Sequence, residues 1–344
     1  MSENIENLPK QTIVIPIRNE AQFIAATIGF LQGQDYPHEK MEIIVVDGES
    51  DDGTVSIVSE IAAGERRVKL LRNPRQLSSA ARNIGARSAT GEIITFIDGH
   101  TFIDNDQLLR NIALAMTEYD ISVLSRPQFL ETPDNDMFQR AVALARRTAF
   151  GHGLDSTIYL ERDEIVDPTS SGASYRREVF DKIGYFDERF DAAEDWEFNY
   201  RAHLNGYRSF TSPKLAVYYY PRRNFGGLFR QMMRYGIGRF RFFRKHRSGL
   251  GSGALFPTAF VLGPPAMLLL SIAWPASLLI FAFGVGLYLF LALASSIYIS
   301  FKNGWGYFRL LPFIYMTIHW SLGWGFLAEM MNTILGNRSW RSQA

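Results

Sequence analysis

The sequence predicts an α/β domain with a mostly parallel sheet, followed by a basic amphipathic segment and a group of transmembrane helices. Short β-branched runs alternate with amphipathic stretches over residues 11–221, as expected of a parallel sheet that is covered by helices on both faces. Residues 222–247 contain nine Lys and Arg and no acid. Residues 248–301 contain no Asp, Glu, Lys or Arg at all, and such a stretch is hard to bury in a soluble core.

The strands of the first part are expected where Ile and Val run together, and the helices where apolar residues recur with helical spacing. We expect strands at Gln11–Pro16, Met41–Val46, Val68–Leu71, Ile93–Ile97, Ile121–Leu124 and Lys214–Tyr220, with a strand or turn at Thr169–Tyr175. We expect helices at Glu20–Gly33, Thr54–Ala63, Leu77–Ala89, Asp104–Met116 and Glu194–Asn205, and another from Arg176. Residues 134–168 are less regular, and we interpret them as a surface excursion.

Three apolar segments follow, at residues 254–274, 276–301 and 310–331, each about the 20 residues that a membrane-spanning helix needs. Pro257, Pro264 and Pro265 are expected to break the first of these helices, which would then span or re-enter the membrane. We therefore predict a domain at 1–221, an interface segment at 222–247 and a membrane domain at 248–344.

The formal net charge of +1 conceals an uneven distribution of charge along the chain. The first part carries −11, the basic segment +9 and the remainder +3. The 47% hydrophobic and 14% aromatic content excludes a disordered chain, and the absence of cysteine excludes disulfides and thiolate metal sites. The start of the chain, MSENIENLPK, has no apolar signal region, so we expect the first part to stay in the cytoplasm.

Polar residues cluster where three predicted strands end. The clusters are Arg18–Asn19–Glu20, Asp47–Gly48–Glu49–Ser50 and Asp98–Gly99–His100. Ligands of parallel α/β sheets bind beyond the carboxyl ends of the strands, so Arg18, Glu20, Asp47, Asp52 and Asp98 are expected to converge on a nucleotide pocket. Each Asp alone could instead form an Asx-turn or cap a helix.

Asp98 and His100 form an Asp-x-His pair just past a strand. Ligands at i and i+2 can reach one cation, and a carboxylate with an imidazole suits Mn²⁺ better than Mg²⁺. A turn without a metal would explain the same tripeptide.

Arg75, Arg82 and Asn83 lie in the stretch NPRQLSSAARNIG. Ser78 and Ser79 are expected to cap a helix whose N-terminus could face a phosphate, with Arg82 one turn further on. The alternative is an ordinary capped and solvated helix.

Glu194 and Asp195 open the predicted helix EDWEFNYRAHLNG. Acids in a first turn commonly stabilise the helix dipole. The functional alternative is a general base, which must lie within hydrogen-bond reach of a hydroxyl group.

The basic segment interleaves Arg and Lys with Phe, Leu and Met. Such a helix is suited to an anionic membrane surface, and nucleic acid is the rival partner for a basic patch. The apolar segments that follow favour the membrane. Gln231 and Arg234 share a helix face and could point back at a leaving group.

Taken together, these stretches resemble family 2 glycosyltransferases of the GT-A fold, in the family's order, from about Thr12 to Arg247. The resembling stretches are IVIPIRNE, IVVDGESDDGT, SSAARNIGARSATGEIITFIDGH, AAEDWEFNYRAHLNGYR and QMMRY. With its Asp-x-His and three apolar segments, the chain is most similar to the ExoA-type glucosyltransferases of succinoglycan synthesis.

The resemblance implies a role for each of these positions. Pro16, Arg18, Glu20 and Asp47 would line the uridine site, and Asp98 would lie near the ribose and diphosphate. The remaining residues that would bind the nucleotide sugar are Ser50, Asp52, Arg75 and Arg82. His100 stands where the family usually has a metal-binding Asp, so the metal, Mg²⁺ or Mn²⁺, is open. Asp195 would be the catalytic base, oriented by Glu194. Gln231 and Arg234 would bind diphosphate or acceptor, and Tyr235, in place of the family's Trp, would stack on an acceptor sugar.

These inferences lead to one expected function and two alternatives. We expect an inverting transfer of a sugar, glucose by resemblance, from a UDP-sugar to a polyprenyl-diphosphate-linked oligosaccharide at the cytoplasmic face of a bacterial inner membrane. A polyprenyl-phosphate sugar synthase is the nearest alternative, because its anionic acceptor needs no base. A non-catalytic nucleotide-binding membrane scaffold is the other.

Overall fold

The structure, a computed structural model, describes residues 8–130, 132, 134, 136–152, 158–247 and 252–336. The chain forms two compact units. The first comprises Met1–Thr132 and Thr157–Tyr220, and the second comprises Pro133–Ser156 and Pro221–Ala344.

The first unit contains an eight-stranded sheet in the order β3-β2-β1-β4-β9-β6-β10-β8. Strands β1 to β4 are mutually parallel, β9 runs antiparallel to both β4 and β6, and β8 runs antiparallel to β10. The strands are β1 (Gln11–Ile17), β2 (Met41–Asp47), β3 (Val68–Arg72), β4 (Ile93–Phe96), β6 (Val123–Ser125), β8 (Glu164–Val166), β9 (Gly172–Arg176) and β10 (Ser209–Thr211). This sheet confirms the predicted α/β fold with mostly parallel strands.

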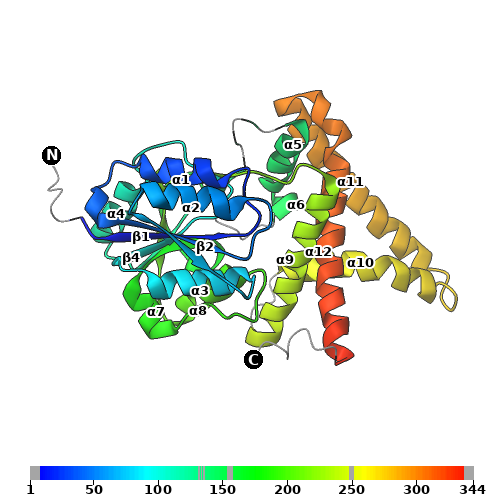
Figure 1. The fold of residues 1–344 in the computed structure, drawn as a ribbon. Coiled ribbons are helices and arrows are strands. Elements are labelled where there is room, and N and C mark those ends of the chain that lie inside the picture. The colour runs from blue at the N-terminus through cyan, green and yellow to red at the C-terminus, as the bar shows by residue number, and fades with distance from the viewer. Residues whose placement is uncertain are drawn as a thin grey trace. The chain divides into compact units, whose positions relative to one another are not determined.

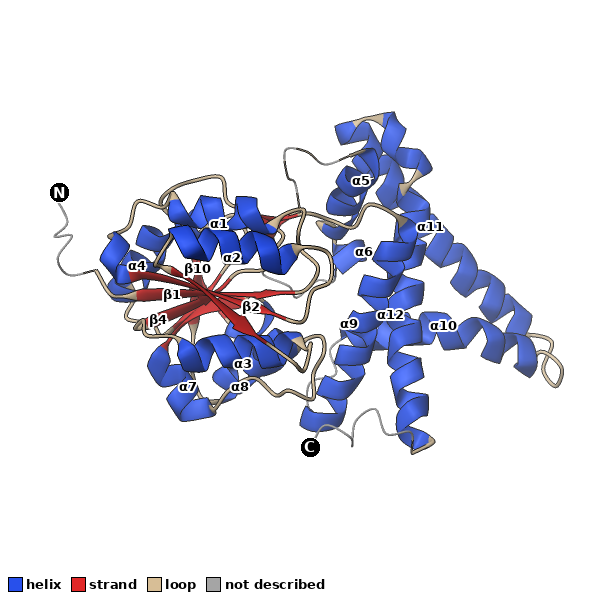
Figure 2. Ribbon diagram, viewed as in Figure 1, coloured by secondary structure: helices blue, strands red, loops and turns tan. Residues whose placement is uncertain are grey.

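Helices cover both faces of this sheet, with α1 and α2 on one face and α3, α7 and α8 on the other (Figures 1 and 2). The helices of the first unit are α1 (Ile24–Gln32), α2 (Thr54–Gly64), α3 (Ser78–Ser88), α4 (Leu108–Glu118), α7 (Arg177–Ile183) and α8 (Glu194–Leu204). The Ile and Val side chains of β1 and β2 are buried between the layers, which explains why these strands are continuous apolar runs in the sequence.

The first unit also contains a second, three-stranded sheet of the order β5-β11-β7. Its strands are β5 (Thr101–Phe102), β7 (Gln128–Phe129) and β11 (Val217–Tyr219). The predicted strand at Lys214–Tyr220 is therefore shorter than expected, because Pro213–Leu215 form a 3₁₀ helix. Strands of two or three residues are too short to show an alternation of apolar and polar residues, so β5, β7, β8 and β10 were not predicted.

The helix predicted at Glu20–Gly33 begins only at Ile24. Asn19 has a left-handed backbone conformation (φ 58°), and the backbone N–H groups of Asn19 and the two residues after it donate to side chains of the loop that follows β2. Asn19 N donates to Ser50 Oγ (2.8 Å), Glu20 N to Thr54 Oγ1 (2.9 Å) and Ala21 N to Asp52 Oδ2 (3.1 Å). These three bonds hold the two loops together and delay the start of the helix.

The second unit is helical. Its helices are α5 (Met137–Arg146), α6 (Ala149–His152), α9 (Phe225–His246), α10 (Ser252–Leu270), α11 (Ser277–Asn303) and α12 (Leu311–Ile334), with a 3₁₀ helix at Trp305–Arg309. The interpretation of residues 134–168 as an irregular surface excursion is wrong for α5, because Ala141, Val142 and Ala145 are fully buried in the core of this unit. The Ala-rich, polar-capped stretch DMFQRAVALAR was the missed signal.

The prediction that prolines break the helix after residue 254 is also wrong. Pro257, Pro264 and Pro265 all lie inside the continuous helix α10. This helix packs against α11 and α12, and at Gly323 the α12 backbone approaches the Pro257 carbonyl so closely that a Cβ would clash. Neighbouring helices commonly compensate for prolines in this way.

Among the described residues, one helix is long and apolar enough to cross a membrane, α11 at Ser277–Asn303. The apolar part described in α10, Phe256–Leu270, is shorter. Helix α12 is packed closely on α9 and carries the buried Glu329, whose carboxylate pairs with Arg241 of α9 at 2.8 Å. The expectation of three spans is thus supported for the 276–301 segment alone.

Candidate active site

The nucleotide-pocket residues predicted at the ends of β1 and β2 form a tightly bonded loop. Asp47 Oδ2 accepts from Ser50 N at 3.0 Å and its Oδ1 accepts from Ser50 Oγ at 2.6 Å. Asp52 Oδ1 accepts from Thr54 N at 3.1 Å. Asp52 thus makes an Asx-turn, which was the structural alternative for an Asp at these positions, whereas the Asp47 carboxylate holds the loop by accepting from the Ser50 backbone and side chain.

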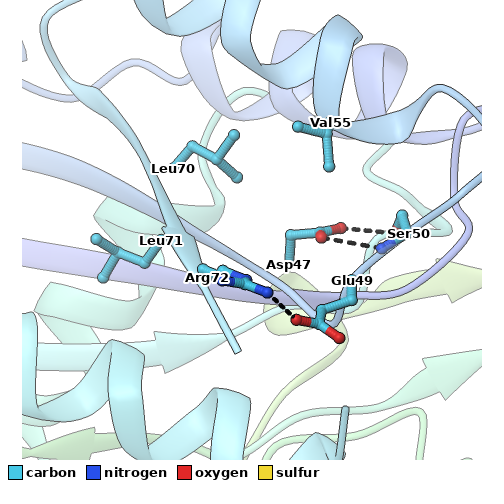
Figure 3. A pocket seen from close by; sticks show the side chains of 7 residues that line it. All are labelled: Asp47, Glu49, Ser50, Val55, Leu70, Leu71 and Arg72. Carbon is cyan, nitrogen blue, oxygen red and sulfur yellow. Dashed lines mark hydrogen bonds and ion pairs between the residues drawn. The ribbon is translucent and has the colours of Figure 1, made fainter. Parts of the chain in front are cut away.

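A pocket of about 450 Å³ opens beside this loop. It is lined by Asp47, Glu49, Ser50, Val55, Leu70, Leu71 and Arg72 (Figure 3). One wall is apolar, and the other presents the loop carboxylates with an ion pair between Arg72 and Glu49. Such a combination suits a planar, partly polar group such as a nucleobase. Arg72 was missed because it closes a strand that carried no polar cluster in the sequence.

Pro16, Arg18 and Arg75, which were also expected to bind the nucleotide sugar, are not among the residues that line this pocket. Pro16 is half-buried, and Arg18 is exposed at the end of β1. Arg75 forms an ion pair with Glu188, which also accepts from Asn83 Nδ2 at 2.8 Å.

The second predicted cluster gathers around a buried arginine. Arg82 is 9% exposed, and its Nη2 lies 3.1 Å from Asp98 Oδ1 while its Nε lies 3.2 Å from Glu194 Oε1. The guanidinium also lies over the ring of Phe96, 5.3 Å from the centroid. Arg82 therefore joins the carboxylate that follows β4 to the acidic first turn of α8.

The expectation that Ser78 and Ser79 cap α3 is wrong, since no side chain caps this helix. Ser78 Oγ donates instead to Glu194 Oε1 at 2.6 Å, and Ser79 Oγ to the carbonyl of Phe190 at 2.8 Å. The alternative of a solvated helix is wrong as well, because Ser79, Arg82 and Asn83 are buried. The polar face of α3 therefore bonds to the first residue of α8 and to the loop just before it.

Asp195 lies next to Glu194, and Ala193 before it has a left-handed backbone (φ 64°). Burial, followed by the neighbouring charge of Glu194, raises the pKa of Asp195 to about 6, although the Arg82 charge acts in the opposite direction. A carboxylate with a raised pKa is a better proton acceptor than an ordinary Asp.

His100 and Asp98 were expected to share one cation. His100 Nδ1 lies 2.8 Å from Glu20 Oε1, while Asp98 contacts Arg82. Within the described ranges, no group of three His, Asp or Glu side chains forms a metal site. Asp98 and His100 still offer a carboxylate and an imidazole from one turn, so the chemistry of the donors fits a divalent ion whose other ligands come from a diphosphate.

One further residue near this cluster, Arg126, was missed. Arg126, directly after β6, is 3% exposed, and its Nη2 donates to the Phe96 carbonyl at 2.7 Å and lies 3.4 Å from Tyr219 Oη. The carboxyl-end argument that selected Asp47 and Asp98 applies equally to the end of β6 and would have found Arg126.

Gln231, Arg234 and Tyr235 lie on α9 in the second unit. Gln231 Nε2 lies 3.4 Å from Tyr235 Oη, as expected for neighbours at i and i+4. Tyr235 is 36% exposed and Arg234 is also exposed. Their predicted role stays a prediction.

The fold of the first unit is that of GT-A glycosyltransferases. The chain belongs to glycosyl transferase family 2, whose family model matches residues 12–184, and it is therefore a glycosyltransferase.

Two curated relatives match almost the whole chain. The succinoglycan biosynthesis protein ExoA of Rhizobium meliloti is 30% identical over 90% of this chain and 92% of its own length. A dolichyl N-acetyl-α-D-glucosaminyl phosphate 3-β-D-2,3-diacetamido-2,3-dideoxy-β-D-glucuronosyltransferase of Methanococcus voltae is 24% identical over 96% of this chain and 99% of its own.

A solved structure shares the fold. The mannosyltransferase PcManGT of Pyrobaculum calidifontis, in complex with GDP-Man and Mn²⁺, has a TM-score of 0.62 at 21% identity and covers 97% of this chain and 89% of its own.

The raised pKa of Asp195 predicts a pH-dependent stability. Its ordinary pKa is 3.8 and its folded pKa about 6, so ionisation of the folded protein has a cost that appears as the pH rises from 4 to 6 and then stays constant. Asp195→Asn should therefore raise Tm at pH 8 by a few degrees, since about 1 kcal/mol shifts Tm by roughly 2–4 °C for a domain of this size.

At pH 4 the increase in Tm caused by Asp195→Asn should be small. Asp181→Asn, an exposed aspartate on α7, is the matched control and should leave Tm unchanged at both pH values. Thermal unfolding of the three proteins measures the effect, and a Tm of Asp195→Asn at or below the wild-type value at pH 8 would refute the raised pKa.

Proposed function

We propose that the protein is an inverting glycosyltransferase that moves a sugar, glucose, from a UDP-sugar to a polyprenyl-diphosphate-linked oligosaccharide in exopolysaccharide synthesis. The observation that carries this proposal is the carboxylate of Asp195, whose pKa is raised, next to the bonded cluster of Glu194, Arg82 and Asp98. Inverting transfer needs one base to deprotonate the acceptor hydroxyl as it attacks the anomeric carbon.

The residues take distinct roles in this proposal. Asp195 accepts the proton of the acceptor hydroxyl, and Glu194, fixed by Ser78 and Arg82, keeps the turn in place. The pocket beside Asp47 takes the uracil and Asp98 faces the diphosphate, with Pro16, Arg18 and Glu20 at the entrance. Gln231, Arg234 and Tyr235 meet the diphosphate or the acceptor sugar.

A divalent cation, Mg²⁺ or Mn²⁺, would be held by Asp98 and His100. When bound, it neutralises the charge that develops on the departing diphosphate. Glu20, which lies against His100 Nδ1, would fix the orientation of the imidazole, as partners of metal-bound histidines commonly do.

The acceptor proposal draws on the relatives. The name of the Methanococcus voltae enzyme describes transfer to a sugar already attached to a dolichyl phosphate, and such an acceptor presents a hydroxyl. A polyprenyl-phosphate sugar synthase uses an anionic phosphate oxygen and needs no base, and the raised pKa of Asp195 favours the hydroxyl acceptor over it.

For location, we propose attachment to the cytoplasmic face of a bacterial inner membrane. The basic segment 222–247 would meet the anionic headgroups, and residues 248–344, with α11 as the candidate span, would form the anchor. Residues 1–221 would provide the catalytic part.

Asp195→Asn should abolish sugar transfer, by at least about 100-fold because general-base catalysis contributes roughly 10²–10⁴. UDP should bind as before, since the pocket beside Asp47 is unchanged. Radiolabelled transfer to extracted lipid-linked acceptors measures the first effect and calorimetry with UDP the second. Asp181→Asn serves as the control, and near-normal transfer by Asp195→Asn would exclude this residue as the base.

The pairing of Asp98 with His100 predicts an unusual metal preference. His100→Asp restores an all-oxygen donor set, which suits Mg²⁺ better than an imidazole does. The ratio of activity with Mg²⁺ to activity with Mn²⁺ should rise several-fold in this variant, measured after removal of metal with a chelator. If the ratio stays constant, His100 does not contact the metal.

A further inference from the structure

A buried arginine contacts the chain on both sides of the turn that carries Asp98 and His100. Arg126 directly follows β6 and is 3% exposed. Its Nη2 donates to the Phe96 carbonyl at 2.7 Å and lies 3.4 Å from Tyr219 Oη. All of these residues belong to the first unit.

The two contacts of this guanidinium lie on opposite sides of the turn. Strand β4 ends at Phe96, just before Asp98, and β5 begins at Thr101, directly after His100. Tyr219 of β11 is paired with Thr101, and its ring lies 6.0 Å from that of His100. One nitrogen of Arg126 therefore bonds to the strand that enters the turn and lies close to the partner of the strand that leaves it.

The Phe96 carbonyl lies where the main sheet becomes irregular. The ladder between β4 and β9 ends at the pair of Thr95 and Ser174, and the register of β9 with β6 shifts after Leu124. A buried carbonyl needs a donor, and the Arg126 guanidinium supplies one just beyond the last paired residue. On the β9 side, the end of β4 is thus held by a side chain instead of a neighbouring strand.

An arginine is a costly residue for this position. Its Nε and Nη1 are buried and have no hydrogen-bond partner within the described part of the chain, and buried donors without partners destabilise a fold. An apolar side chain of similar volume would avoid this cost, as is often found for buried charges. Packing alone does not explain Arg126, whereas its contacts with both sides of the turn do.

We propose that Arg126 is a positioning residue for the metal–diphosphate site. Through the Phe96 carbonyl and Tyr219, it holds the turn in the conformation in which Asp98 and His100 reach one divalent cation, without contacting the cation itself. This inference rests on the proposed function, because it takes Asp98 and His100 as the metal ligands.

The test is Mn²⁺ binding to the full-length protein in detergent with saturating UDP, measured by the loss of the electron paramagnetic resonance signal of free Mn²⁺. Arg126→Gln should weaken Mn²⁺ binding by about tenfold or more, as is typical when a residue that orients metal ligands is lost. UDP without metal should bind as in the wild type, because other residues line the pocket beside Asp47. Unchanged Mn²⁺ affinity in Arg126→Gln would overturn the proposal.

Arg177→Gln is the matched control. Arg177 Nη2 donates to the carbonyls of Ala89 at 2.6 Å and Gly91 at 2.8 Å, just before the start of β4. Both variants remove a guanidinium that holds one end of this strand, so both should lower Tm, but Arg177→Gln should leave Mn²⁺ affinity unchanged. An equal loss of Mn²⁺ affinity in the two variants would show a general structural role for Arg126 and contradict a positioning role.

Where Arg126→Gln does not fold, Arg126→Lys decides the outcome, because it keeps a buried cation. A single ammonium nitrogen does not reproduce the planar guanidinium, so Mn²⁺ binding should weaken by about threefold or more. Wild-type affinity in Arg126→Lys, in the absence of a folded Arg126→Gln protein, would exclude the proposed role.

Kinetics separate positioning from catalysis. In sugar transfer by Arg126→Gln, the Mn²⁺ concentration for half-maximal activity should rise about tenfold, while kcat at saturating Mn²⁺ stays within about twofold of the wild-type value. A reduced kcat with a normal Mn²⁺ requirement would contradict the proposal.

Mn²⁺ binding to Asp98→Asn distinguishes failure of this inference from failure of the proposed function. Unchanged affinity in Asp98→Asn would refute the proposed metal ligands, and this inference with them. A loss in Asp98→Asn without a loss in Arg126→Gln would overturn the role of Arg126 alone.

Discussion

The contact between Arg82 and its two carboxylate partners determines the geometry of the candidate active site. Asp98 follows a central strand and Glu194 opens a helix more than 90 residues later in the sequence. One buried guanidinium bonds to both. Glu194 is only 6% exposed, and removing one partner from a buried ion pair typically costs about 3–5 kcal/mol, so the contact of Arg82 with Glu194 fixes where the first turn of α8 lies.

The contacts of Arg82 also determine the electrostatics of the candidate active site. Asp98, Glu194 and Asp195 place three carboxyl groups in a small volume, and Arg82 offsets part of their repulsion. Burial, together with the repulsion that Arg82 does not offset, keeps the pKa of Asp195 raised. The site is thus acidic enough to attract a cation and still contains a carboxylate that can accept a proton near neutral pH. A separate bonded network, from Asp52 and Thr54 through Glu20 to His100, connects the pocket beside Asp47 to the Asp-x-His turn.

Much of this could be predicted from the sequence. Apolar strands that end in polar clusters predicted the parallel sheet and the edge of it that carries the site, because β1, β2 and β4 consist almost entirely of buried residues. The acidic start of α8 was equally visible. The partners of these residues were not, since Arg82 looks like part of an ordinary amphipathic helix and its two carboxylates are distant in the sequence. Helix α5 was missed because it joins a core formed by residues from the other end of the chain.

The pH dependence of kcat/KM in wild type, Arg82→Lys and Arg82→Gln tests this role of Arg82 most directly, because kcat/KM reports the ionisation of the free enzyme. The wild-type activity should fall as the pH drops through about 6, where Asp195 becomes protonated. Arg82→Lys keeps the positive charge and should keep this transition near its wild-type position. Arg82→Gln removes the charge that lowers the pKa of Asp195, so its transition should move to higher pH. A transition that stays in place in Arg82→Gln, or moves to lower pH, would contradict the account.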